Sequence, residues 1–312
     1  LDEEVKNTCK ILDSRSITGD IWTLAEEKSI AIIEKMKKKG KLLGSYINNK
    51  IFYGIKTGLN EAFIINDDTR KTLIENDPKC SELIKNFAIG DDIRKYKINF
   101  KNRYLIFIPN GWTNKNSKNI CDKWKWFSST YPSISSYLKQ FEEKAKKRCD
   151  QGEYWWELRP CDYYSEFEKP KIVYPDIAKE SRFTYDLNKT YLGNTVYFIP
   201  SNDLYLLGIL NSNAIFYFFK KIASVLGDAD KGGRLRWFSQ DIVKIPIPDK
   251  KNENLEPLVR QALSVQNELS ISKTDIDRDI LEKQINLIDK KINRIVYELY
   301  ELTEDEIKII EQ

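Results

Sequence analysis

The sequence predicts an α+β (mixed α/β) fold, in which a domain of mixed sheet and helices is followed by an antiparallel helical hairpin. Three observations support this prediction. Segments with apolar residues at helical spacing alternate irregularly with short runs rich in β-branched and aromatic residues. From residue 251 onward, apolar residues recur at steps of three and four. With 312 residues, of which 41% are hydrophobic and 31% charged, the chain is long enough to bury a full core.

The pattern divides the chain into three parts. Residues 1–22 are polar and weakly patterned, as expected of a linker. Because the chain begins with Leu1 and not with Met, we expect a fragment of a longer protein, with the linker leading from a missing upstream domain. Residues 23–250 form the mixed domain, and residues 251–312 form the hairpin.

The mixed domain contains clear helix and strand signals. Helices are expected at 23–39, at 68–86 with a break at Pro78, at 132–148 and at 203–223. Strands are expected at 96–100, 104–109, 171–174, 183–187 and 195–199. A lysine run before Gly40 ends the first helix, and Asp203 is the N-cap of the last.

The rest of the chain is organised around residues 51–65, IFYGIKTGLNEAFII. Gly54 and Gly58 bracket Lys56 and Thr57, so the backbone can adopt positive φ and bare N–H groups can approach an anion such as phosphate. The apolar flanks would hold this loop at the rim of a sheet. The alternative is an ordinary turn between two strands. The loop lacks the patterns of nucleotide P-loops and dinucleotide-binding folds, which argues against ATP and NAD.

A second glycine-rich loop covers residues 227–236 and is basic at its end. Lys231, Arg234 and Arg236 lie within six residues, beside two glycines. Such a segment suits a close approach to a polyanion.

Residues 110–129 interleave aromatic and basic side chains. Trp112, Trp124 and Trp126 occur among lysines, a pattern that can stack on bases and neutralise phosphates. We favour the alternative in which the tryptophans pack into the core while the lysines stay exposed.

Charge and residue types exclude several classes of function. The net charge is +4, from 51 Lys and Arg against 47 Asp and Glu, so any nucleic-acid binding needs a local basic surface. The chain has no histidine, which excludes His-dependent nucleases, Ser-His-Asp and Cys-His hydrolases and most zinc sites. The five cysteines include no Cys-x-x-Cys pair, which predicts free thiols in a reducing cytoplasm. The apolar run at 204–219 is too short and too polar to span a bilayer.

The last part of the chain carries an apolar seam typical of a coiled coil. The seam residues are Leu255, Leu258, Ala262, Val265 and Leu269, and, after a turn at 270–274, Leu281, Ile285, Ile288, Ile292, Ile295, Leu299 and Leu302. The resulting hairpin either covers its own domain or serves as a spacer or subunit-docking element.

Several short motifs together resemble one known family. They are GIKTGLNEAF at 54–63, WWELR at 155–159, FEKPKI at 167–172, LNS at 210–212, IPIP at 245–248 and VYELY at 296–300. In this order they are similar to the TaqI-like C-terminal specificity domain, which occurs in type IIG restriction-modification enzymes and adenine-specific DNA methyltransferases. The resemblance spans roughly residues 23–310.

The resemblance implies a target recognition domain, which reads double-stranded DNA in the major groove while a separate domain methylates a flipped adenine. This chain has no Asn-Pro-Pro-Tyr or Asp-Pro-Pro-Tyr tetrapeptide and no glycine-rich S-adenosylmethionine motif. S-adenosylmethionine and Mg are therefore expected only for the missing domains. Pro175-Asp176 is not followed by Glu-x-Lys, so no metal-nuclease site is expected. By itself the chain is expected to be non-catalytic, with DNA and a methyltransferase domain or subunit as partners.

On such a domain, cations would contact phosphates and a few side chains would read base edges. The candidate DNA-contacting residues are Lys56, Thr57 and Asn60 in the central loop, Arg94 and Arg103, and Lys231, Arg234 and Arg236 in the second loop. Each has a structural alternative, which is a solvated charge or, for Arg94 and Arg103, a salt bridge. A second function class stays open: a protein-interaction module that docks a methyltransferase subunit or dimerises through the C-terminal helices.

Overall fold

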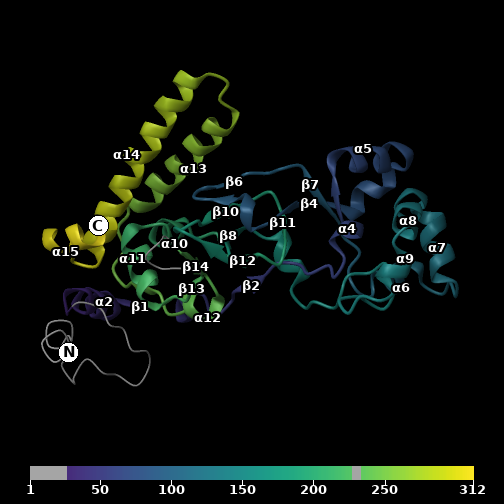
Figure 1. Cartoon of the computed structure of the whole chain (residues 1–312), viewed down its shortest axis with the longest axis horizontal. Coiled ribbons are helices and arrows are strands. Elements are labelled where there is room, and N and C mark those ends of the chain that lie inside the picture. Colours follow the sequence, from purple (N-terminus) through teal and green to yellow (C-terminus); the bar gives the residue numbers. More distant parts are fainter. Residues whose placement is uncertain (1–26, 227–232) are drawn as a thin grey trace, which may run out of the picture.

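The structure is a computed structural model that describes residues 27–226 and 233–312. It confirms the mixed α+β class, because many short and two long helices surround several small sheets. Figure 1 shows an elongated molecule with two lobes. The two long helices, α13 (Leu255–Ile271) and α14 (Asp275–Leu299), project side by side from one lobe, and a group of short helices forms the other.

A four-stranded antiparallel sheet lies between two hydrophobic cores. Its strands, in spatial order, are β10 (Thr184–Asp186), β8 (Lys171–Pro175), β12 (Val196–Ile199) and β2 (Phe52–Tyr53). Successive side chains of a strand point to opposite faces. Accordingly Ile172 and Tyr174 lie in the first core, whereas Val173 lies in the second. The single sheet therefore joins the two lobes of the molecule.

The first core is covered mainly by helices. These are α2 (Glu27–Lys39), α10 (Leu204–Leu210), α11 (Asn213–Ile222), α13, α14 and α15 (Glu304–Ile310). Around them lie the short elements β1 (Gly40–Leu42), α3 (Leu43–Tyr46), β9 (Ile177–Ala178), β13 (Val225–Leu226), β14 (Arg234–Arg236), α12 (Ser239–Ile242) and β15 (Pro246–Pro248). Strand β1 pairs with β15, and β14 pairs with both β13 and β9.

The second core contains another small sheet. Its strand order is β11 (Tyr191–Leu192), β4 (Ile84–Ala88), β7 (Arg103–Ile106) and β3 (Ile64–Asn66), with β11 parallel to β4. The helices around it are α4 (Asn60–Phe63), α5 (Asp67–Asn76), η2 (Pro78–Leu83), α6 (Trp112–Ser117), α7 (Lys123–Thr130), α8 (Pro132–Lys139), α9 (Glu142–Ala145) and η4 (Tyr164–Glu168). The remaining elements are η3 (Gly90–Asp92), β5 (Ile93–Arg94) and β6 (Lys97–Ile98).

Two predicted helices are each broken into two. Residues 132–148 form α8 and α9, and residues 203–223 form α10 and α11. Asp203 caps α10 as predicted, with its carboxylate accepting from the Leu206 N–H at 3.0 Å. The second break occurs because the buried Asn211 amide bonds both backbone groups of Phe183, and the Ser212 hydroxyl then caps α11.

The predicted helical hairpin is present, and its lower half is part of the first core. Leu255, Val259, Ile292 and Val296 are fully or almost fully buried there. Gly208 of α10 lets α13 approach closely, since a Cβ at this position would lie 2.7 Å from the Val259 side chain. The predicted seam ends earlier than expected, because α14 stops at Leu299 and the chain turns into α15.

The distal half of the hairpin is largely exposed. Four large apolar side chains lie open to solvent there: Ile271, Ile276, Ile280 and Leu287, with 78%, 75%, 56% and 60% of their surface exposed. The hairpin therefore covers its own domain at the base and presents an apolar surface at its tip.

The aromatic segment packs as we favoured. Phe127 and Trp156 are buried and stacked on each other, with ring centroids 5.8 Å apart. Trp124 lies against Trp156 at 5.0 Å and packs on the second core. The predicted tryptophans Trp112, Trp124 and Trp126 pack against the second core and are each partly exposed, and these rings stabilise the helical lobe.

A buried ion pair joins Lys171 of β8 to Asp186 of β10, the strand at one edge of the four-stranded sheet. Lys171 and Asp186 both have fully buried side chains, and Lys171 Nζ lies 2.6 Å from Asp186 Oδ2. Lys171 also donates to the Phe167 carbonyl, while Asp186 accepts from the Asn188 and Thr190 N–H groups. Burial lowers the pKa of Lys171, and Asp186 opposes that effect.

Other features of the described ranges concern thiols, metals and membranes. Four of the cysteines lie there and all are free thiols. No cluster of three or more His, Cys, Asp or Glu within residues 27–226 and 233–312 is arranged to hold a metal ion. Among the helices that the structure describes, none is both long and apolar enough to cross a membrane.

Candidate nucleic-acid interface

The central loop, residues 54–60, connects the two small sheets. The Gly54 N–H donates to the Val196 carbonyl at 2.8 Å, which continues the pairing of β2 with β12. A Cβ on Gly54 would lie 2.0 Å from the Gly193 carbonyl oxygen, so only glycine fits. After the loop the apolar run resumes as the short helix α4 and only then as β3, which belongs to the other sheet. The loop is thus a joint between two sheets, and the prediction of a turn at the rim of one sheet is corrected.

Thr57 and Asn60 have different positions in this loop. Thr57 is buried, with 1% of its surface exposed. Its hydroxyl donates to Asn60 Oδ1 at 2.6 Å and accepts from the Leu59 N–H at 3.2 Å. Thr57 therefore shapes the loop from within, whereas Asn60 is exposed.

Arg148, which the sequence analysis did not single out, holds the central loop from below. Its guanidinium donates to four backbone carbonyls, those of Thr57, Asp150, Trp155 and Glu157. It also lies over the Phe63 ring, 4.3 Å from the centroid. Only 7% of Arg148 is exposed, and burial lowers its pKa to about 10, so it stays protonated at neutral pH. A basic residue at the end of a helical pattern gives no signal that distinguishes it from a solvated lysine or arginine.

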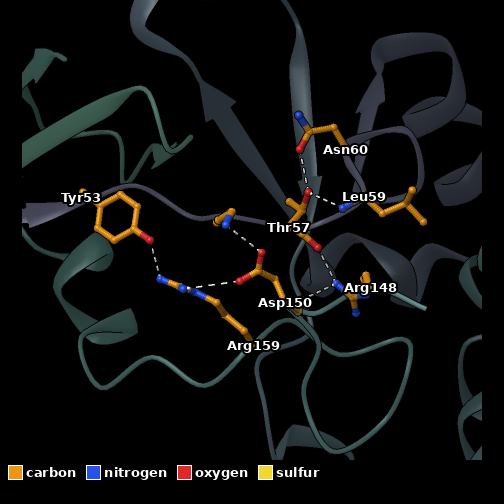
Figure 2. Close-up of polar contacts among 8 residues, drawn as sticks. Tyr53, Thr57, Leu59, Asn60, Arg148, Asp150 and Arg159 are labelled. Carbon is orange, nitrogen blue, oxygen red and sulfur yellow. Dashed lines mark hydrogen bonds and ion pairs between the residues drawn. The ribbon is translucent and has the colours of Figure 1, made fainter. Parts of the chain in front are cut away.

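A small charge network surrounds the loop (Figure 2). Asp150 Oδ2 lies 3.2 Å from Lys56 Nζ, and Asp150 Oδ1 lies 3.5 Å from Arg159 Nη1. Arg159 also donates to the Tyr53 hydroxyl at 2.6 Å. Half of the Lys56 side chain and a third of the Arg159 side chain are exposed, at 52% and 32%, so both cations are accessible to a ligand.

A row of tyrosines leads from this network across the four-stranded sheet. Tyr53 and Tyr197 are register partners on β2 and β12, with ring centroids 6.3 Å apart, and Tyr197 stacks on Tyr174 of β8 at 5.6 Å. Directly opposed residues lie on the same face of a sheet. Tyr174 is buried, whereas Tyr53 and Tyr197 are partly exposed. The accessible part of the row therefore consists of Tyr53 and Tyr197, and Tyr53 lies next to Arg159.

Strand β14 pairs with β9, which directly follows β8 in the chain. Arg236 is the register partner of Ile177 and Leu235 of Ala178, immediately after β8. Burial raises the pKa of Asp176 and the nearby Arg236 opposes this rise. Burial also raises the pKa of Tyr197, with Asp176 adding to it.

The two described arginines of β14 point outward. Leu235 is buried, so Arg234 and Arg236, on either side of it, face the other way. Arg234 is exposed, and Arg236 lies over the Phe238 ring at 5.5 Å. The third predicted cation of this loop, Lys231, lies outside the described residues.

Arg103 fits its structural alternative, a salt bridge, whereas Arg94 forms hydrogen bonds with backbone carbonyls. Arg103 pairs with Asp92, whose side chain is fully buried, so this arginine stabilises the turn around η3. Arg94 donates to the backbone carbonyls of Asp91 at 2.9 Å and of Ile93 at 2.8 Å.

The geometry thus assembles a part of the predicted set. We call the set formed by Lys56, Arg159, Tyr53, Tyr197, Arg234 and Arg236 the recognition face. Two of its cations, Lys56 and Arg159, form ion pairs with Asp150. The other two, Arg234 and Arg236, lie on β14. Partly exposed aromatic rings between clusters of cations can contact a polyanion and the groups it carries.

Known proteins resemble this chain both in sequence and in structure. The profile of the family described as the TaqI-like C-terminal specificity domain matches residues 85–247. Type II methyltransferase M.MjaIV from Methanocaldococcus jannaschii is 24% identical over 266 residues, which cover 81% of this chain and 82% of that protein. Type II methyltransferase M.BstVI from Geobacillus stearothermophilus is 23% identical over 321 residues, which cover 99% of this chain and 49% of that protein.

A solved structure shares the fold. It is the type IIL restriction-modification enzyme MmeI in complex with DNA, with a TM-score of 0.53 and 13% sequence identity. The match covers 83% of this chain and 34% of that one. The chain therefore spans about a third of MmeI and about half of M.BstVI, but most of M.MjaIV.

Proposed function

The chain belongs to the TaqI-like C-terminal specificity domain family, and from this premise we propose that it recognises a sequence in double-stranded DNA for a type IIG-like restriction-modification enzyme. Methyl transfer to adenine, and DNA cleavage where it occurs, would be carried out by a part outside residues 1–312. S-adenosylmethionine and Mg would bind to that part. Residues 23–250 would form the recognition domain, and residues 251–312 the helical hairpin that covers it.

The observation that carries the proposal is the recognition face. It combines Lys56 of the central loop, the neighbouring Arg159, and Arg234 and Arg236 of β14, which are distant from one another in the sequence. Recognition of a duplex needs cations spaced over a surface to bind phosphates, together with a few side chains that reach base edges. Arg234, which is exposed, and Arg236, which is partly exposed, suit the second task, since guanidinium groups bind guanine O6 and N7 in the major groove.

Replacing Arg234 and Arg236 together by Ala is expected to weaken DNA binding at least tenfold. The reason is that each good base contact contributes about 1–3 kcal/mol of discrimination. Titration of a labelled duplex that contains the selected site measures the effect. The melting temperature should not change, because both side chains lie outside the core.

A matched control removes the same charge elsewhere. Arg260→Ala with Arg278→Ala takes two exposed arginines from the hairpin, where they pair with neighbouring carboxylates. This control should bind DNA nearly as tightly as the parent. Equal losses in both double variants would mean that bulk charge, and not the recognition face, determines binding.

One observation favours the alternative of an interaction module. The exposed apolar tip of the hairpin, formed by Ile271, Ile276, Ile280 and Leu287, is a surface that a methyltransferase part or a second copy could cover. In that case DNA contact would be minor. Salt-sensitive binding of DNA by the isolated chain separates the two functions, since only the recognition domain requires it.

A further inference from the structure

We infer that the central loop binds one backbone phosphate of the DNA, and that Asp150 competes with this phosphate for Lys56 and Arg159. The inference rests on the proposed function and adds to it the group that the loop contacts. It also assigns a negative role in binding to a specific carboxylate. Three features of the loop carry it: its free N–H groups, the buried charge beneath it and the position of Asp150.

The first feature is the orientation of the Thr57–Gly58 peptide. The Thr57 carbonyl points to the buried Arg148, which donates to it at 2.6 Å. In a trans peptide the C=O and N–H groups point in opposite directions, so the Gly58 N–H faces away from Arg148. Gly58 is exposed and has a φ of +68°. Within the described part of the chain, no hydrogen bond uses the N–H of Lys56, Thr57 or Gly58.

The second feature is the charge of Arg148. Its four hydrogen bonds go to carbonyl groups, and none of the described carboxylates forms a salt bridge with it. Its Nε–H also lacks a partner among the described residues. A fixed cation that binds a carbonyl polarises the peptide and strengthens the N–H on its other side as a donor. Arg148 therefore strengthens the Gly58 N–H as a hydrogen-bond donor to an anion, although Arg148 itself is buried.

The third feature is the balance of charge around the loop. Lys56 and Arg159 both pair with the Asp150 carboxylate, and Arg148 donates to the Asp150 carbonyl, so three cations lie around this one aspartate. Asp150 is mostly covered, with 17% of its side chain exposed, and lies next to Gly58. The Asp150 carboxylate forms ion pairs with the two accessible cations, Lys56 and Arg159, and its negative charge repels an incoming phosphate. Lys56 and Arg159 must therefore exchange this carboxylate for the phosphate when DNA binds.

The test compares Lys56→Met and Asp150→Asn in the full chain. Binding of each variant to a specific and to a random duplex is measured at several salt concentrations. Lys56→Met should weaken binding several-fold on both duplexes, and the slope of log affinity against log salt should become shallower by about 0.9. Asp150→Asn should strengthen binding several-fold on both duplexes. Lys283→Met, which removes an exposed lysine from the hairpin, should change neither quantity.

The possible outcomes separate this inference from the proposed function. If the parent binds DNA with a sequence preference but neither substitution changes affinity or slope, the loop holds no phosphate. If Lys56→Met alters the preference for one base pair and leaves the slope unchanged, the loop reads a base and the inference is wrong. If the parent does not bind DNA at all, the proposed function fails first.

A second arm distinguishes DNA from a free anion. Inorganic phosphate is titrated against the parent–DNA complex at constant ionic strength. No displacement is expected, because a single phosphate lacks the contacts that the rest of the duplex makes. Displacement that Lys56→Met abolishes would assign the loop to a free phosphate and overturn the inference.

Discussion

A chain that ends at Asp249 is expected to lose its cooperative unfolding transition. The truncation removes helices α13, α14 and α15, which contribute the buried side chains Leu255, Val259, Ile292, Val296 and Tyr300 to the first core. Burial of a large apolar side chain contributes about 1.5–3 kcal/mol. Several such losses together exceed a typical net stability of about 5–15 kcal/mol. Thermal unfolding followed by circular dichroism measures the result.

The exposed tip of the hairpin offers the control for this experiment. Changing Ile271, Ile276 and Ile280 to Ser keeps all three helices and removes only side chains that face solvent. This variant should unfold cooperatively at nearly the parent temperature. A cooperative transition in the truncated chain would contradict the account and would make residues 251–312 an appendage with a separate function.

Lys171→Met is expected to destabilise the protein by about 3–5 kcal/mol, because it leaves the buried Asp186 carboxylate without its cation. Asp186 also binds the backbone of residues 188–190, so the loop after β10 should loosen as well. Urea unfolding, monitored by tryptophan fluorescence, gives the change in the free energy of unfolding.

Two further variants test the reason for this loss. Lys169→Met removes an exposed partner of Glu166 and should change the stability by less than about 1 kcal/mol. The double variant Lys171→Met with Asp186→Leu removes both buried charges and should recover part of the lost stability. If Lys171→Met and Lys169→Met have the same small effect, the ion pair is not the feature that stabilises this end of the sheet.

Local signals in the sequence predicted the elements that depend on neighbouring residues. The lysine run before Gly40 ends α2 at Lys39, and the carboxylate of Asp203 caps α10. The hydrophobic run at 171–174 forms β8, which is buried on both faces. The helical steps after residue 251 form α13 and α14. In each case the structure is determined by residues within a few positions of one another.

The features that the sequence could not predict depend on contacts between distant segments. The loop at 54–60 joins two sheets because β2 pairs with residues 197–198, whereas β3 pairs with residues 103–105. Arg148 reaches a carbonyl 91 positions away. Arg103 is drawn into an ion pair with a buried aspartate of η3. The spacing of residues in the sequence does not show which distant segments come into contact. For this reason the sequence predicted only a part of the candidate site.

The recognition face is the part of the candidate site to which the sequence contributed most. Lys56, Arg234 and Arg236 stand out in the sequence because these cations lie beside glycines, and in the structure Lys56 and Arg234 are exposed and Arg236 is partly exposed. Arg159, Tyr53 and Tyr197 were missed as candidates, since a single arginine or tyrosine in a strand pattern is more commonly structural. The variants above test the proposed roles of Lys56, Arg234 and Arg236 in DNA binding.

The most direct test of the central claim is selection of bound DNA from a pool of random duplexes. The full chain is incubated with the pool at about 50 mM and about 200 mM salt, and the retained DNA is sequenced. The account predicts one enriched sequence motif and binding that falls steeply between the two salt concentrations. Retained DNA without any enriched motif would contradict sequence recognition by this chain, and the absence of binding at the lower salt concentration would contradict its role in DNA binding.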